Sequence, residues 1–221
     1  MESQTPMDTL PPTTSTNPIT SYPASFDVDY PQRLDKLTTF FRLFTVIPIL
    51  LLLAILTGGT ANVQYFGQVV IAGQGVVFFA PLLMILFRQK YPRWWFNWNL
   101  EYTRFQFRVM SYMFLLRDEY PSTDEEQAVH VNLVYPNAKQ LNRGMPLVKW
   151  FLAIPHFIVL FVLFFVVALL VICAWFAILF TGRYPKAIFD FIVGYCRWSL
   201  RVNAYAFLLI TDEYPPFKFD P

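Results

Sequence analysis

The chain has 221 residues with a formal net charge of +2, and 56% of them are hydrophobic whereas only 14% are charged. A soluble domain usually carries about 25% charged residues, so this composition excludes both an ordinary soluble globule and a disordered chain. Collagen-like, coiled-coil and disulfide-rich classes fail on the same grounds, which leaves an integral membrane protein.

The first 25 residues differ in composition from the rest of the chain. They are rich in Pro, Ser and Thr and contain no Lys or Arg. Such a segment buries too little apolar surface to offset its ordering entropy. We therefore predict that residues 1–25 form a disordered tail, or one that a partner captures.

The first membrane segment is expected soon after residue 40. Residues 43–87 contain no Asp, Glu, Lys or Arg, and a charge-free apolar stretch becomes a candidate span at roughly 18 residues. A Gly-rich turn composition interrupts this run at 57–62. Two helices, over 40–56 and 71–87, are therefore predicted to form a hairpin.

A second charge-free run covers residues 150–182. It lacks turn residues, since no Gly, Pro, Asn or Asp occurs from 157 to 180. A single helix of the whole run would nevertheless be roughly 50 Å long, against a hydrocarbon core of about 30 Å. The run alone leaves open a tighter hairpin, over 147–163 and 166–180, or one long helix. The charges and an internal repeat favour the hairpin.

Basic residues cluster at the edges of both runs, at 33–42, 88–93, 139–149 and 183–186. If each run is a hairpin, all four clusters lie on one face of the membrane. The positive-inside rule makes this face cytoplasmic. The pattern predicts a multi-pass membrane protein whose N-terminus and basic clusters are cytoplasmic.

An internal repeat relates the two halves of the chain. Residues 87–116 match 180–209 at a constant offset of 93, and 12 of the 30 positions are identical. Duplication of one module would give two tandem units, which repeats of this kind indicate. The units cover 26–121 and 129–221, with an acidic linker at 122–128.

Each unit is predicted to contain a short extended lead-in, a helical hairpin and an amphipathic interfacial helix. The amphipathic helices are expected over 93–116 and 186–210, and Tyr-Pro pairs mark the element boundaries. The predicted fold class is therefore an all-α integral membrane protein of two tandem helical-hairpin modules.

The second module resembles a known family. The residues that carry the resemblance are 152–156, 174–185, 197–205 and 212–217. They are similar to an uncharacterised bacterial membrane-domain family, domain of unknown function 4389. The resemblance is strong over 130–219 and looser over 26–121, where Ile49 takes the place of His156. It implies a bacterial inner-membrane protein and implies no chemistry.

Two pairs of arginines lie in the predicted amphipathic helices: Arg104 with Arg108, and Arg197 with Arg201. Each pair is spaced i, i+4, so its members share a helix face. We expect these arginines to anchor the helices in the phosphate layer of the membrane. The sharper hypothesis is a binding site for a lipid headgroup or another anionic ligand.

Trp94, Trp95, Trp98 and Trp198 are candidates for an aromatic belt at the membrane surface. The alternative is a protein-binding face, because aromatic residues and Arg dominate interface hot spots.

His156 is the one residue of the second run that titrates near neutral pH. An ionisable residue within a membrane is a functional hypothesis by default, and a neutral imidazole could ligate the metal of a haem or a chlorin. We favour the simpler interpretation, a satisfied histidine near the interface. Bound lipid is expected, whereas a pigment or haem is not.

The sequence contains no Gly-rich phosphate loop, zinc motif or nucleophile elbow. No catalytic or metal-binding residue is therefore assigned, and no nucleic-acid partner is expected. The predicted function is that of a non-catalytic accessory or scaffolding subunit of a larger membrane assembly, with lipids and other integral membrane proteins as partners. The alternative is a lipid- or small-molecule-binding protein or transporter that uses the arginine pairs. An enzyme acting on lipid is a third hypothesis.

Overall fold

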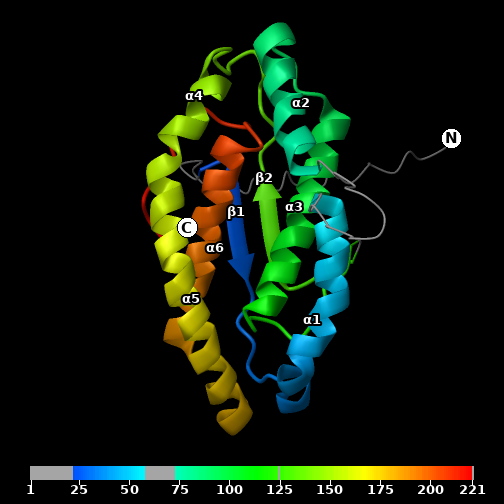
Figure 1. Cartoon of the computed structure of the whole chain (residues 1–221), viewed down its shortest axis with the longest axis vertical. Helices are drawn as coiled ribbons and strands as arrows, with labels where there is room; N and C mark the ends of the chain where they lie inside the picture. The colour runs from blue at the N-terminus through cyan, green and yellow to red at the C-terminus, as the bar shows by residue number, and fades with distance from the viewer. Residues whose placement is uncertain (1–21, 58–72, 124, 221) are drawn as a thin grey trace, which may run out of the picture.

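The computed structural model describes residues 22–57, 73–123 and 125–220, which form six helices and two strands (Figure 1). The strands are β1 (Ala24–Val28) and β2 (Val129–Leu133). The helices are α1 (Lys36–Thr57), α2 (Gly73–Arg88), α3 (Arg93–Met113), α4 (Met145–Leu152), α5 (Ile154–Thr181) and α6 (Lys186–Ala206). The fold is thus mostly helical, as expected.

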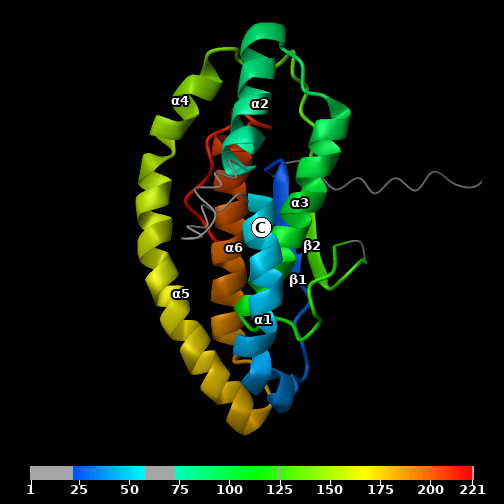
Figure 2. The same cartoon turned by 45° about the vertical axis from the view of Figure 1, so that its right-hand side comes forward.

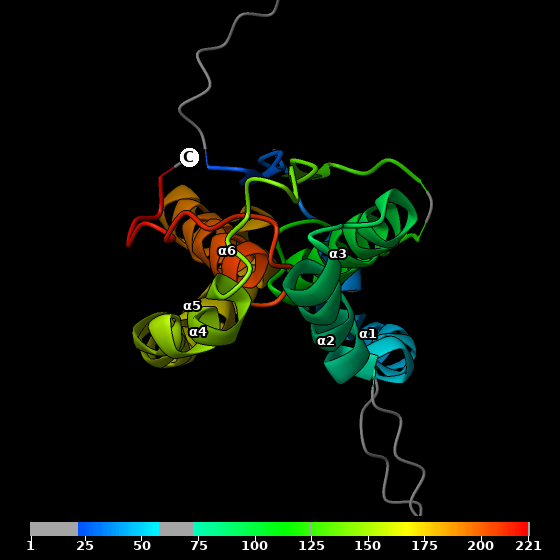
Figure 3. The ribbon, with the colours of Figure 1, turned by 90° about the horizontal axis from the view of Figure 1, so that it is seen from above.

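The elements form three layers, which are seen from above in Figure 3. The strands make up the first layer, α3 and α6 the second, and the other four helices the third. Helix α6 packs on β1 and α3 on β2, whereas α5 contacts α6 and α1 contacts α3. The main hydrophobic core lies on both sides of the α3/α6 layer, since it includes buried side chains of the two strands and also of α2 and α5. We call α1, α2, α4 and α5 the outer layer.

The two strands pair antiparallel, with Phe26 opposite Val131. In each strand buried and exposed side chains alternate, as the period of a half-buried strand requires. The buried set contains Ala24, Phe26, Val28, Val129, Val131 and Leu133. Both extended lead-ins are therefore strands, and they pack on the middle layer.

The two predicted amphipathic helices are present as α3 and α6. Each begins directly after a Tyr-Pro pair, at Pro92 and Pro185, because the residue before a proline is biased away from helical geometry. The middle layer is covered by strands on one side and by the outer layer on the other (Figure 3). The interfacial position of these helices stays a prediction.

The predicted hairpin over 147–163 and 166–180 is wrong. Helix α5 continues without a turn to Thr181, and only Ala153 separates it from α4. Nothing in 157–180 interrupts a helix, and Pro155 is tolerated because it lies in the first turn. The helix ends at Gly182, whose φ of 70° is left-handed and whose N–H donates to the carbonyl of Ile178.

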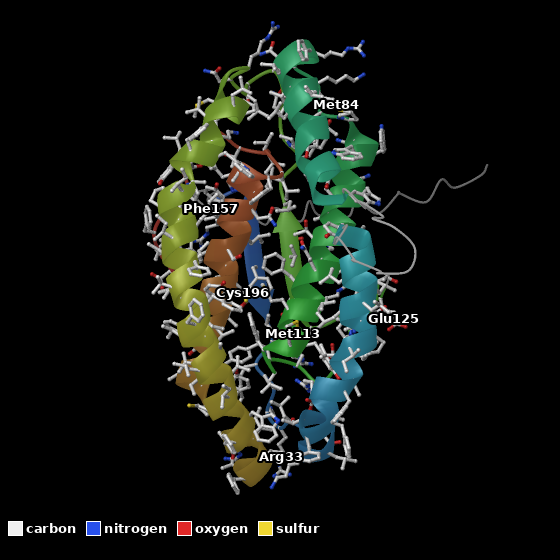
Figure 4. The ribbon with its side chains drawn as sticks, in the orientation of Figure 1. Arg33, Met84, Met113, Glu125, Phe157 and Cys196 are labelled. Atoms are coloured by element: carbon white, nitrogen blue, oxygen red, sulfur yellow. The ribbon has the colours of Figure 1, made fainter. Side chains whose placement is uncertain are left out.

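The first run does not form the expected antiparallel pair either. Helix α1 begins where Leu34 N–H donates to the carbonyl of Gly182, and α2 ends where the Gln89 amide donates to the carbonyl of Leu141. These places are at opposite ends of the molecule, as the positions of Arg33 and Met84 in Figure 4 show. The two helices therefore follow each other along the long axis. The turn expected near 57–62 lies outside the described residues, apart from Thr57.

Helix α1 is bent by 55° between its parts 36–42 and 44–53. Pro48 explains the bend, because its ring clashes with the carbonyl four residues earlier. By length and composition, one helix among the described residues could cross a membrane, the nearly continuous Met145–Thr181, and α1 would be a second if its two bent parts count as one. The two predicted hairpins would have crossed the membrane four times, which is more than these candidate spans allow.

Tyrosines of the Tyr-Pro pairs tie the two halves of the chain together. Tyr91 O–H donates to the carbonyl of Leu208, and Tyr184 O–H to that of Phe114, both at 3.0 Å. Burial raises the pKa of both hydroxyls, so each remains a protonated donor. In two further Tyr-Pro pairs, Tyr30 O–H and Tyr135 O–H donate to the carbonyls of Tyr184 and Tyr91.

Candidate functional site

The outer layer exposes large apolar side chains along its whole length. On α5 the exposed set includes Ile158, Phe161, Phe165, Leu169, Phe176 and Phe180. On α1 it includes Phe40, Phe44, Ile47 and Leu51. Soluble monomers rarely expose contiguous apolar patches of more than a few hundred Å². This layer is therefore the candidate functional surface.

The opposite face, formed by the strands, is polar. Asp27 is 68% exposed and forms an ion pair of 2.8 Å with Arg197. His130 lies beside Asp29 with an N···O distance of 3.4 Å, and both side chains are more than half exposed. The sheet therefore presents a polar, exposed face, in contrast to the apolar outer layer.

The structure gives Arg197 and Arg201 partners within the protein. Arg197 Nε–H donates to the carbonyl of Phe26 at 2.9 Å. Arg201 is only 3% exposed, and its guanidinium donates to the carbonyls of Lys218 and Asp220. Burial lowers the pKa of Arg201, and the neighbouring Arg197 lowers it further. This pair holds β1 and the C-terminal segment against α6.

The first arginine pair has the same kinds of partners. Arg104 Nε–H donates to the carbonyl of Val131 at 3.2 Å and pairs with Glu101 at 2.7 Å. Arg108 is 7% exposed and donates to the carbonyl of Ser122 at 2.9 Å. All four arginines thus attach the middle layer to strands or following segments, on the side away from the outer layer. Headgroup binding by them stays a prediction.

A polar cavity of about 490 Å³ lies beside the first pair. Arg104, Arg108 and His130 contribute to its lining, together with the carboxylates of Asp29, Glu119 and Glu126. Because three carboxylates outnumber the two guanidinium groups, the cavity does not favour an anion.

Three of the four tryptophans form an aromatic ladder on α3. Trp94 lies edge-on to Trp95 at 5.4 Å, Trp95 stacks on Trp98 at 5.6 Å, and Trp98 stacks on Tyr102 at 5.5 Å. Trp94 and Trp98 are exposed, as a belt or a protein-binding face requires. Trp198 is buried instead, so it does not belong to this exposed set.

His156 is fully buried between α5 and α6. Its Nδ1 accepts a hydrogen bond of 3.1 Å from Trp198 Nε1–H, and its ring stacks on Phe217 at 3.9 Å. An axial ligand would have to present a ring nitrogen to an open cavity, and aromatic side chains enclose this ring. His156 Nε2 is also buried but has no hydrogen-bond partner among the described residues, so only one of the two ring nitrogens is satisfied there. Both the satisfied-histidine interpretation and the metal-ligand hypothesis stay predictions.

Two ion pairs were not anticipated from the sequence. Lys149, on α4, is wholly buried and pairs with Asp212 at 2.7 Å. Its Nζ also donates to the carbonyl of Thr211 at 2.7 Å. Arg42, on α1, pairs with Asp118 and stacks over the ring of Tyr112 at 4.5 Å. The recurrence of Asp-Glu-Tyr-Pro after each middle helix was the available signal for these acidic partners.

Three further cavities adjoin the outer layer. One is apolar, has a volume of about 280 Å³ and lies between α1 and α5. The other two are basic and lie near the two ends of the layer, with volumes of about 390 and 360 Å³. In residues 22–57, 73–123 and 125–220, no group of three or more His, Cys, Asp or Glu is placed to hold a metal ion.

Residues 145–218 match the model of a family described as a domain of unknown function (DUF4389). The match includes α4, α5 and α6. The resemblance found in the second module is thereby confirmed over these residues. No curated protein and no solved structure matches the chain.

Proposed function

We propose that the chain is a non-catalytic accessory or scaffolding protein of a membrane. The outer layer would be held in lipid, while the strand layer would face water and remain available to a partner. The observation that carries this proposal is the apolar surface that continues from Trp150 on α4 to Phe180 at the end of α5.

The magnitude of this surface supports membrane attachment. Covering one large apolar side chain contributes about 1.5–3 kcal/mol, so six exposed residues of α5 would contribute on the order of 10 kcal/mol. That exceeds the binding of a single acyl anchor, which is marginal and reversible. The buried Arg, Lys and His side chains support a structural task, because the protein itself satisfies most of their polar atoms.

Membrane attachment is tested by replacing Phe161, Phe165 and Leu169 together with Gln. We expect the intact chain to remain in the membrane fraction after a high-salt wash and the triple variant to be released. A matched control replaces the exposed apolar residues Val134 and Tyr120, outside the outer layer, with Gln. Equal retention of the triple variant and the control would contradict the proposal.

The accessory role is tested by extraction in a gentle detergent. One chain has a mass of 25.9 kDa. We expect a particle whose protein mass, by light scattering with correction for detergent, exceeds that of one chain. A monomer as the sole species, with no co-purifying protein, would contradict an accessory role while leaving membrane attachment intact.

A second candidate function is the binding of a lipid chain in the apolar cavity between α1 and α5. Its lining includes Arg42, Val46, Val171 and Trp175. Filling the cavity with Val171→Trp is expected to remove co-purifying lipid, measured by native mass spectrometry. Val159→Trp, on the exposed face of α5, is the control. Unchanged lipid in Val171→Trp would exclude this candidate.

A further inference from the structure

We infer that the protein lies flat in one leaflet, with the axis of α5 in the membrane plane, and that a basic pocket at each end binds the phosphates of anionic phospholipids. This inference rests on the proposed membrane attachment. It concerns the orientation of the molecule and the lipid that it selects.

The first pocket, of about 390 Å³, lies where α5 ends and α1 begins. Its cationic residues are Arg33, Lys36 and Arg183, and all three are exposed. Lys36 Nζ donates to the carbonyl of Phe180 at 3.1 Å, which fixes this ammonium group at the end of the apolar surface. Asp35 also lies here, and the three cations outnumber it.

The second pocket, of about 360 Å³, lies where α2 ends and α3 begins. Arg88, Lys90 and Arg93 provide its positive charge, and Trp94 forms part of its wall. An exposed Trp beside cations is typical of the headgroup level of a membrane. The positions of Arg33 and Met84 in Figure 4 show that the two pockets lie at opposite ends of the long axis.

The apolar surface runs directly into both pockets. Phe180, 79% exposed, precedes the first pocket, and Phe87, 73% exposed, precedes Arg88 in the second. A phospholipid beside either end would place its acyl chains against the outer layer and its phosphate among three cations. Clusters of Lys and Arg next to an apolar surface bind anionic leaflets in this way.

The orientation follows from what lies beside α5. The strands, the middle helices and the outer layer all run along the same long axis (Figures 1 and 2). If α5 crossed the bilayer, the exposed Asp27 and His130 of the strands would enter the hydrocarbon with it. The outer edges of a two-stranded sheet would also lose water from their backbone groups. Both are strongly unfavourable in lipid, whereas the flat orientation leaves the sheet in water.

Charge complementarity identifies the occupant as an anionic leaflet. In the flat orientation both basic ends contact the headgroups of the same leaflet, and the apolar surface between them enters its acyl region. An upright molecule would place one basic end on each side of the membrane. The two pockets therefore favour the flat orientation independently of the polar sheet.

The pockets are tested by flotation of the full chain with neutral phosphatidylcholine vesicles and with vesicles that also contain phosphatidylglycerol. One variant carries Arg33→Gln, Lys36→Gln and Arg183→Gln, and the other carries Arg88→Gln, Lys90→Gln and Arg93→Gln. Each removed cation is expected to weaken binding to anionic vesicles about fivefold, hence on the order of 100-fold for either variant. Binding to neutral vesicles should stay unchanged.

The control variant combines Arg117→Gln with Lys218→Gln, which remove exposed or partly exposed cations outside both pockets. It should lose little affinity for anionic vesicles. If both end variants bind anionic vesicles like the unaltered chain, the pockets are not headgroup sites. If only one end variant loses affinity, the flat orientation is wrong. Failure of every protein to float, even on neutral vesicles, would instead overturn the proposed membrane attachment.

Orientation is tested by single cysteines at the exposed Gln32 and Gln140, which lie near opposite ends of the molecule, in a Cys173→Ser background. In sealed membrane vesicles of uniform orientation, a membrane-impermeant maleimide should label both positions or neither until detergent is added. Labelling of one position with protection of the other would place the ends on opposite sides and overturn the inference.

Discussion

Lys149 carries a positive charge at a position with no solvent exposure, so it depends on Asp212 and the carbonyl of Thr211. Removing one partner of a buried ion pair leaves an uncompensated charge, which typically costs 3–5 kcal/mol. The Asp212 side chain is 26% exposed, and water therefore compensates part of that loss. This pair attaches α4 to the segment that follows α6.

We predict that Asp212→Asn lowers the free energy of unfolding by about 2–4 kcal/mol. The measurement is denaturant or thermal unfolding in detergent. The control is Asp190→Asn, which breaks the exposed pair with Lys186 and should cost less than about 0.5 kcal/mol. Equal effects of the two substitutions would show that the buried pair stabilises the fold no more than the exposed pair does.

A second prediction at the scale of single residues concerns the buried tyrosine hydroxyls. Tyr91→Phe and Tyr184→Phe each remove one hydrogen bond between the halves of the chain, and each should lower the free energy of unfolding by about 1 kcal/mol. Exposed Tyr120→Phe should cost nothing measurable. Unfolding midpoints of the three variants check this prediction, and it fails if Tyr91→Phe behaves like Tyr120→Phe.

The sequence predicted which arginines share a helix face but could not predict what they contact. Arg197 reaches Phe26, which lies 171 positions earlier in the chain. Such a contact depends on strand pairing and on layer packing, and neither leaves a local pattern. His156 was interpreted as a satisfied side chain, but the described part of the structure gives a partner to Nδ1 and none to Nε2, so that interpretation stays a prediction.

At the scale of elements, helix starts were easier to predict than chain reversals. Pro92 and Pro185 define the starts of α3 and α6 because their effect on the backbone is local. The first hairpin was predicted from the turn composition at 57–62, and the second from the charge pattern and the internal repeat. The charge argument depends on the assumption that each run crosses the membrane. The absence of turn residues in 157–180 was the correct signal, since a helix continues where nothing breaks it.

Gly194 on α6 provides a prediction at this scale. A Cβ at this position would lie 2.6 Å from Cβ of Phe219, so the C-terminal segment packs against the helix only because residue 194 is Gly. Gly194→Ala should displace residues 216–220 and increase their hydrogen exchange. Gly144→Ala, whose added Cβ would have its nearest neighbour at 3.8 Å, should leave that exchange unchanged. Identical exchange in both variants would contradict the packing argument.

At the scale of the whole molecule, similar contacts recur in the two halves of the chain. Arg42 binds Asp118 as Lys149 binds Asp212. Leu115 and Leu209, which follow the two middle helices, share a positive φ that is uncommon for Leu. We interpret these correspondences as the result of a duplication. The duplication itself stays a prediction.

The positions of the four basic clusters in the fold can be compared with the positions that the sequence predicted. The sequence placed all of them on one membrane face, because hairpins would return the chain to its starting side. In the fold the clusters lie at two ends of an elongated molecule, near the two basic pockets. The proposed flat orientation would again put them on one face. The second hairpin drawn from the charge pattern is wrong, whereas a common face for the four clusters stays a prediction.

The most direct test of membrane attachment in a flat orientation is the depth of α5 in the bilayer. Fluorophores attached singly at Ile158, Phe165, Ile172 and Phe176, in a Cys173→Ser background, can be quenched by lipids that carry a quencher at known depths. We expect similar depths at all four positions, within about 5–10 Å of the headgroup boundary. Depths that reach the bilayer centre near Phe165 and become shallow towards both ends of α5 would show that the helix crosses the membrane and would contradict the account.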